Sequence, residues 1–150
     1  MSLWFRPRIR HPLYPGLAST PAAGATGRCP ALYGTFEDLV RAAAAGAQPR
    51  RAVFVERHPG HPFLNVRERD ELWDRFGVPV LAVLVDDHGV LLGYECEAQQ
   101  GVHLNARFPP GPRHRVERRP CDCGRPGFRL VAKPARRRRQ PVPNACAVIA

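Results

Sequence analysis

Three cysteines and one histidine between residues 93 and 130 have the side chains that a zinc ion requires. Zinc prefers thiolate and imidazole ligands, and a structural site uses four of them in a tetrahedron. Cys96 is followed after six residues by His103, and after 17 more by Cys121 and Cys123. Residues i and i+2 of an extended segment share a face, so the last two can bind together if Gly124 lets the chain turn. We therefore predict a Cys3His zinc site; the alternative is a set of separate buried thiols.

Four protein ligands would fill the coordination shell of this ion. A catalytic zinc keeps one position open for water or substrate, whereas a structural zinc does not. The predicted cofactor is therefore a structural zinc ion, which can hold together a domain too small for a large core.

The same residues resemble part of a known enzyme family. The segments 94–97 (YECE), 101–104 (GVHL) and 121–126 (CDCGRP) are similar to a stretch of the phenylacetate-CoA ligase-like adenylate-forming enzymes, which include the coenzyme F390 synthetase-like proteins. The resemblance covers about 95 residues from Thr35 onward, well short of a whole ligase. It implies a structural zinc site beside an adenylate-binding region, and a partner such as a complementary ligase subunit.

The groups that such a ligase needs for catalysis are missing from the sequence. No Gly-rich loop leading into a helix is present to hold the phosphates of ATP. Where the family has a Thr-Glu motif, this chain has Asp86, Asp87, His88 and Gly89, and the only lysine is Lys133. The two aspartates could meet a metal ion, but a turn explains them equally well. We therefore predict no independent ligase activity and no catalytic or nucleotide-binding residues.

A mixed α/β module must position the four predicted ligands. Helical periodicity with capping residues predicts helices over 35–46 and 65–77, the second with an Asn65–Glu68 capping box and with Leu72 and Trp73 on its apolar side. Strands are predicted over 51–56 and 78–85, the latter buried on both faces. A turn at 86–89 and a returning strand at 90–94 then deliver Cys96, and 128–131 adds a last short strand.

Both ends of the chain are predicted to be irregular. Residues 1–34 contain five prolines, together with Gly16, Gly24 and Gly27, which predict an N-terminal arm with Cys29 as an unlinked thiol. The zinc-stapled domain is placed at 35–131 and a disordered basic tail at 132–150. His58 and His61 fall in a Pro-rich turn with no carboxylate inside it, so a solvated loop is favoured over a site there.

The positive charge of the chain lies mainly at its C-terminal end. The net charge is +10, and residues 113–139 contain eleven basic and two acidic side chains. The alternative function is therefore nucleic-acid binding through this third of the chain, including Arg136, Arg137, Arg138 and Arg139, although only Phe128 is present to stack on bases. No leader or apolar run of about 20 residues is present, so a cytoplasmic location without a membrane span is expected.

Overall fold

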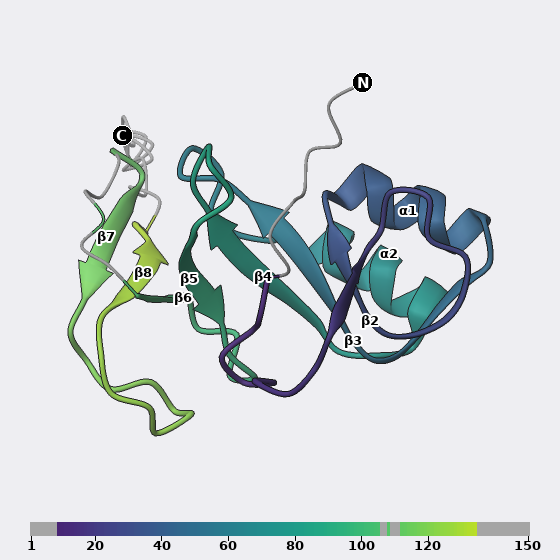
Figure 1. Ribbon diagram of the computed structural model, residues 1–150. Helices are drawn as coiled ribbons and strands as arrows, with labels where there is room; N and C mark the ends of the chain where they lie inside the picture. Colours follow the sequence, from purple (N-terminus) through teal and green to yellow (C-terminus); the bar gives the residue numbers. More distant parts are fainter. Residues whose placement is uncertain (1–8, 106–107, 109–111, 135–150) are drawn as a thin grey trace, which may run out of the picture.

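The computed structural model describes residues 9–105, 108 and 112–134 (Figure 1). In that part of the chain, the strands form one mixed sheet with the order β1-β2-β3-β4-β5-β6-β8-β7. The elements in chain order are β1 (Ser19–Pro21), β2 (Gly27–Gly34), α1 (Phe36–Ala44), β3 (Ala47–Arg57), α2 (Val66–Phe76), β4 (Val80–Val85), β5 (Leu91–Glu95), β6 (Val102–Leu104), β7 (His114–Glu117) and β8 (Arg129–Ala132). The predicted α/β class is therefore confirmed.

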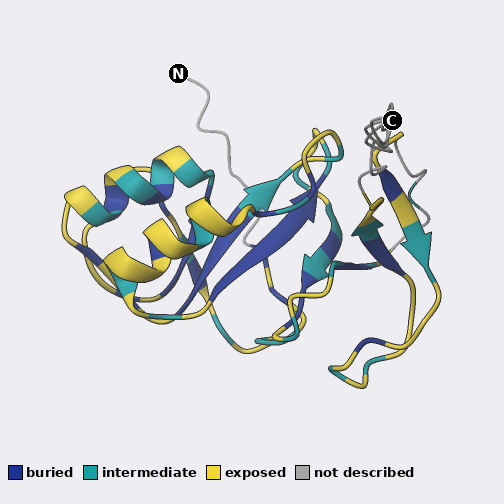
Figure 2. Cartoon of the chain, turned by 180° about the vertical axis from the view of Figure 1, so that it is seen from behind, coloured by how far each residue is buried: buried dark blue, intermediate teal, exposed yellow. Residues whose placement is uncertain are grey.

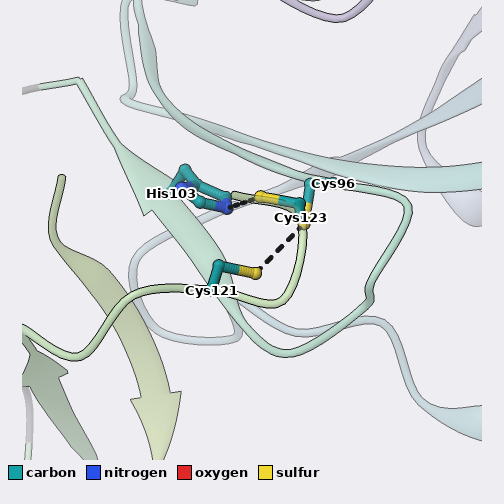
Figure 3. Close-up of side chains that lie close together, drawn as sticks. All are labelled: Cys96, His103, Cys121 and Cys123. Atoms are coloured by element: carbon teal, nitrogen blue, oxygen red, sulfur yellow. Dashed lines mark hydrogen bonds between the residues drawn. The ribbon is translucent and has the colours of Figure 1, made fainter. Parts of the chain in front are cut away.

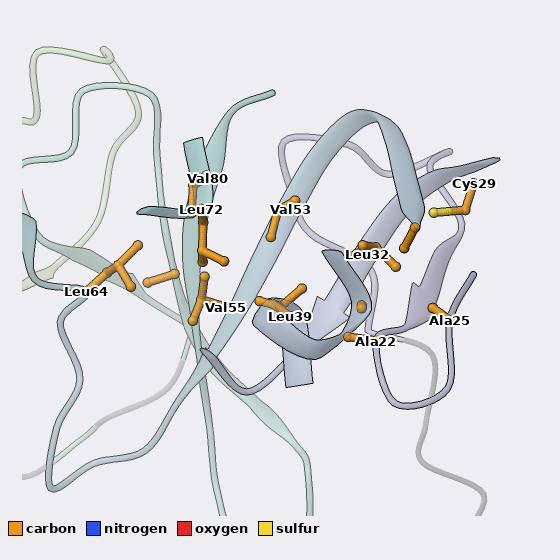
Figure 4. Packing of buried hydrophobic residues seen from close by; sticks show 13 residues of the cluster. Ala22, Ala25, Cys29, Leu32, Leu39, Val53, Val55, Leu64, Leu72 and Val80 are labelled. Carbon is orange, nitrogen blue, oxygen red and sulfur yellow. The ribbon is translucent and has the colours of Figure 1, made fainter. Parts of the chain in front are cut away.

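The N-terminal half is a parallel sheet with both helices on one face. Strands β1 to β4 pair in parallel, with α1 between β2 and β3 and α2 between β3 and β4. Leu39 of α1 and Leu72 of α2 are fully buried, and they pack in one apolar cluster with Leu32, Val53 and Val55 of the sheet (Figure 4). Burial of such side chains contributes roughly 1.5–3 kcal/mol each. This layer forms the larger apolar core.

Residues 9–17 cover the opposite face of the sheet. Ile9 is buried there in an apolar cluster that includes Phe54 of β3, and Tyr14 packs against this cluster. His11 has no exposed surface and stacks on the Phe54 ring, with centroids 4.8 Å apart. Its Nδ1 accepts the Leu13 N–H (3.2 Å), so its Nε2 donates to the carbonyl oxygen of Glu95 (3.1 Å). Burial lowers the pKa of His11 to about 4, which keeps the ring neutral at pH 7.

The prediction of an irregular arm over residues 1–34 is wrong for its described part, because β1 and β2 lie within it. The prolines of this segment do not exclude strands, because of their positions in the sheet. Pro30 lies at a β-bulge, where the register of β2 and β3 shifts between Cys29 and Ala31, and a bulge tolerates a residue without an N–H. Cys29 is a buried core residue of β2, and burial raises the pKa of its thiol. Residues 1–8 lie outside the described residues.

The helix boundaries follow the predicted capping residues. The Thr35 side chain accepts the N–H of Asp38 at 3.2 Å, and the Asn65–Glu68 capping box before α2 is complete. Helix α2 ends at Gly77, which has a φ of 64° and donates its N–H to the Trp73 carbonyl. Neither helix in the described ranges has the length and apolarity needed to cross a membrane.

The C-terminal half extends the sheet with antiparallel strands. All six residues of β4 are buried, as predicted for the strand over 78–85 (Figure 2). Strand β5 returns beside it, and β6, β8 and β7 follow in that order. The predicted hairpin is confirmed, and Cys96 comes directly after its second strand. Of the predicted tail, residues 132–134 are described and residues 135–150 lie outside the described part.

Candidate metal centre

The four predicted ligands meet at one end of β5 and β6. Cys96 follows β5, His103 is the middle residue of β6, and Cys121 and Cys123 lie in the turn between β7 and β8. One ligand atom from each residue lies within 4.8 Å of all the others (Figure 3). Cys96, His103 and Cys121 are buried and Cys123 is partly buried. Cys29 does not belong to this group, and Cys146 lies outside the described residues.

Two of the distances between these atoms are close to the edges of a zinc tetrahedron. The Cys96 and Cys121 sulfurs are 3.6 Å apart, and the Cys123 sulfur is 3.4 Å from His103 Nε2. Tetrahedral zinc with Zn–S bonds of about 2.3 Å places its sulfurs about 3.8 Å apart. A disulfide would need about 2.05 Å between sulfurs. The cluster therefore has the dimensions of a four-ligand metal site and not of a disulfide.

Close approach of the antiparallel strands fixes the position of His103. Strand β6 lies between β5 and β8, with Tyr94 opposite His103 on β5 and their rings stacked at 5.3 Å. A Cβ atom on Gly93 would lie 2.5 Å from the His103 carbonyl oxygen, and one on Gly101 would lie 2.5 Å from the Leu130 carbonyl oxygen. Both glycines are needed because β6 is pressed this closely against its neighbours.

A tight turn presents the last two sulfurs. Gly124 adopts a φ of 77° and donates its N–H to the Cys121 carbonyl at 2.9 Å. The backbone N–H of Arg125 points to the Cys123 sulfur at 3.4 Å. Such an N–H favours the thiolate, which is the form that binds a metal. Gly124 therefore has the role that its position after the Cys-x-Cys pair predicts.

Polar contacts that sequence reasoning missed hold the turn against the β5–β6 connection. The Gln100 amide group donates to the Asp122 carboxylate, and its oxygen accepts the Asp122 N–H at 3.4 Å. Arg125 binds both carboxylate oxygens of Glu97 at 2.8 Å. Each contact joins a neighbour of one ligand to a neighbour of another. No local pattern marks these pairs, because their partners are more than 20 residues apart in the sequence.

The protonation of the ligands depends on burial. Burial raises the pKa of the Cys96 thiol, and its sulfur contacts with Cys121 and Cys123 add to this. For Cys123 burial also raises the pKa, but hydrogen bonds, beginning with that from the Arg125 N–H, outweigh it and lower the value. Burial lowers the pKa of His103, and the charges of Arg129 and Arg125 lower it further. The imidazole is thus neutral at pH 7, the form that binds a metal.

Comparison of the sequence with protein-family models and with curated proteins finds no match.

The other predicted candidates do not join this site. The Asp86 carboxylate accepts the N–H groups of His88 (2.9 Å) and Val90 (2.8 Å), so it shapes the turn between β4 and β5. His58 and His61 form a tight turn, yet His58 lies 3.2 Å from Glu56 at the end of β3. The carboxylate that the loop itself lacks is thus supplied by the preceding strand. Arg136, Arg137, Arg138 and Arg139 lie outside the described residues.

Proposed function

We propose that Cys96, His103, Cys121 and Cys123 bind one zinc ion that holds the C-terminal strands of this α/β protein together. The observation that carries the proposal is the spacing of the four ligand atoms, all within 4.8 Å and with edges of 3.4 and 3.6 Å. Three thiols and one imidazole favour zinc over the harder ions magnesium and calcium, which prefer oxygen.

A structural role follows from the number and burial of the ligands. Four protein ligands leave no position for a substrate, and three of the four residues are buried. The ion would join the end of β5, the middle of β6 and the β7–β8 turn, which are separate in the sequence. Its chemical contribution is to neutralise thiolates that are otherwise unfavourable in a buried site.

The metal content of protein purified without added zinc tests this proposal. We expect one zinc per chain by elemental mass spectrometry in the parent and none in Cys121→Ser/Cys123→Ser. The matched control Cys146→Ser removes a cysteine that is not one of the four proposed ligands, and it should retain one zinc. His103→Cys, which keeps four ligands, should also retain the ion. Equal zinc in the parent and the double variant would reject these ligands.

We further propose that the chain is a non-catalytic module akin to the middle region of phenylacetate-CoA ligase-like enzymes. The support is the quoted resemblance around the four ligands together with the helix-strand-helix-strand-strand order that it implies, which the described elements α1 to β5 share. Asp86 serves its own turn instead of a nucleotide-bound metal. We expect no ATP-dependent pyrophosphate exchange with aryl acids; exchange above a no-enzyme blank would contradict the non-catalytic assignment.

A further inference from the structure

The loop end of the β7–β8 hairpin carries a basic hollow. It has a volume of about 340 Å³ and is lined by Arg115, Val116, Glu117, Arg118 and Arg119. Strand β7 is the edge of the sheet, and it lies at the end of the described chain away from both helices (Figure 1). Arg118 and Arg119 are exposed. We call these residues, together with Phe128, the hairpin surface.

The single carboxylate of the hollow is already neutralised. Glu117 lies 3.1 Å from the buried Arg129, its partner on β8, and 3.6 Å from Arg115. Among the described residues, neither Arg118 nor Arg119 has an acidic partner. The hollow therefore has an excess of positive charge that no group of the described chain balances, and an anion would complement it.

An exposed aromatic ring lies beside these arginines. Glu117 pairs with Arg129 in the β7–β8 ladder, so the next step along the hairpin places Arg118 opposite Phe128. The Arg118 guanidinium lies 5.5 Å from the centre of the Phe128 ring, which stays 48% exposed. Arg118 covers part of the Phe128 ring, and the part that stays exposed offers a flat apolar surface on which a base can stack.

We propose that the hairpin surface binds single-stranded nucleic acid, with phosphates in the arginine hollow and a base stacked on Phe128. Unpaired bases expose the faces that stack on an aromatic ring, whereas a duplex hides them. The sites of phosphate and base contact lie side by side here, as they do along a nucleic-acid strand. This proposal does not depend on the proposed zinc site. A negative result in the binding experiment would therefore leave the zinc proposal unaffected.

Fluorescence anisotropy of the full chain with a labelled 20-nucleotide single-stranded DNA tests the proposal over a series of salt concentrations. We expect Arg118→Gln/Arg119→Gln to weaken binding at least tenfold and to reduce the slope of log K against log salt by about 1.4, at roughly 0.7 per phosphate contact. Phe128→Leu should weaken binding about tenfold with the slope unchanged. Unchanged zinc content and circular dichroism would show that these variants remain folded.

The matched control is Arg50→Gln/Arg51→Gln, an adjacent exposed pair at the start of β3 that changes the net charge equally. It should bind like the parent. An equal loss in this control would overturn the surface in favour of unspecific attraction, and loss only in a variant of Arg136–Arg139 would assign binding to the tail. Equal affinity for a 20-base-pair duplex would also overturn the proposal. So would a chain that does not bind the oligonucleotide but binds anionic lipid vesicles through the same arginines.

Discussion

Removal of the metal with a chelator is expected to lower the unfolding midpoint of the parent chain by roughly 12 °C and to leave Cys121→Ser/Cys123→Ser unchanged. An ion that binds only the folded state stabilises it by about 4 kcal/mol when its free concentration is 1,000 times Kd. Each kcal/mol corresponds to about 2–4 °C in a chain of this size. Differential scanning calorimetry with and without chelator measures the effect.

The loss of order is expected to be local. Strand β6 pairs with β8 at only two positions, and the apolar cluster beneath them has three buried members, Leu84, Val102 and Leu130. The four parallel strands have their own larger core. Hydrogen exchange should therefore show faster exchange in β6 and β8 after chelation and little change in β2 to β4. Equal midpoints and exchange patterns before and after chelation would contradict a structural role for the ion.

The stabilisation by metal is expected to grow with pH. Burial raises the pKa of the Cys96 thiol, so in the metal-free protein at pH 7 this group holds a proton that must leave when the metal binds. Lower pH opposes that loss, and the midpoint difference between metal-bound and metal-free protein should shrink as the solution is acidified. The Cys146→Ser control should follow the parent at every pH.

The sequence predicts which four side chains meet because ligand chemistry is local information. This chain has few cysteine and histidine residues close in sequence to its Cys-x-Cys-Gly turn, so few ligand sets are possible. The hairpin that ends at Cys96 further limits the positions that this ligand can occupy. The contacts that hold the ligand segments together could not be predicted. Gln100 with Asp122 and Arg125 with Glu97 depend on the register of β6 and β8, which no periodicity within either segment specifies.

The helices and the strands β3, β4, β5 and β8 are predicted well, whereas β2 and the short strands β1, β6 and β7 are missed. Capping residues and a continuous apolar run mark α1, α2 and β4 directly. Strands β1 and β6 have three residues each, too short for an alternating pattern. The helical pattern predicts Trp73 on the apolar side of α2, but it is 52% exposed, and Leu72 is the only residue of this helix that is fully buried. Residue type alone predicts burial poorly for a helix that contacts the sheet through so few residues.

A partly buried ion pair connects α2 to the strands that position the candidate metal centre. Arg69 binds the Glu95 carboxylate at 2.7 Å and the Val80 carbonyl at 2.6 Å. The second Glu95 oxygen accepts the N–H of Ala82 in β4 at 3.0 Å. Glu95 is only 6% exposed and directly precedes Cys96. The Glu95 carboxylate therefore accepts a backbone N–H of the sheet and also pairs with a side chain of the helix that covers the sheet. It does so at the residue directly before the proposed ligand Cys96.

Arg69→Ala is expected to destabilise the metal-bound chain by about 3–5 kcal/mol, because it leaves a buried carboxylate without its cation. The matched control is Arg75→Ala on the same helix, whose exposed pair with Glu71 contributes about 0.3–0.5 kcal/mol. Denaturant unfolding measures both changes. Adding Glu95→Gln to Arg69→Ala should recover part of the loss, because a neutral amide is less costly to bury than an unpaired carboxylate. If Arg69→Ala changed the free energy of unfolding no more than Arg75→Ala does, burial of the Arg69–Glu95 pair would not contribute to stability. Apolar packing alone would then connect α2 to the segment that carries Cys96.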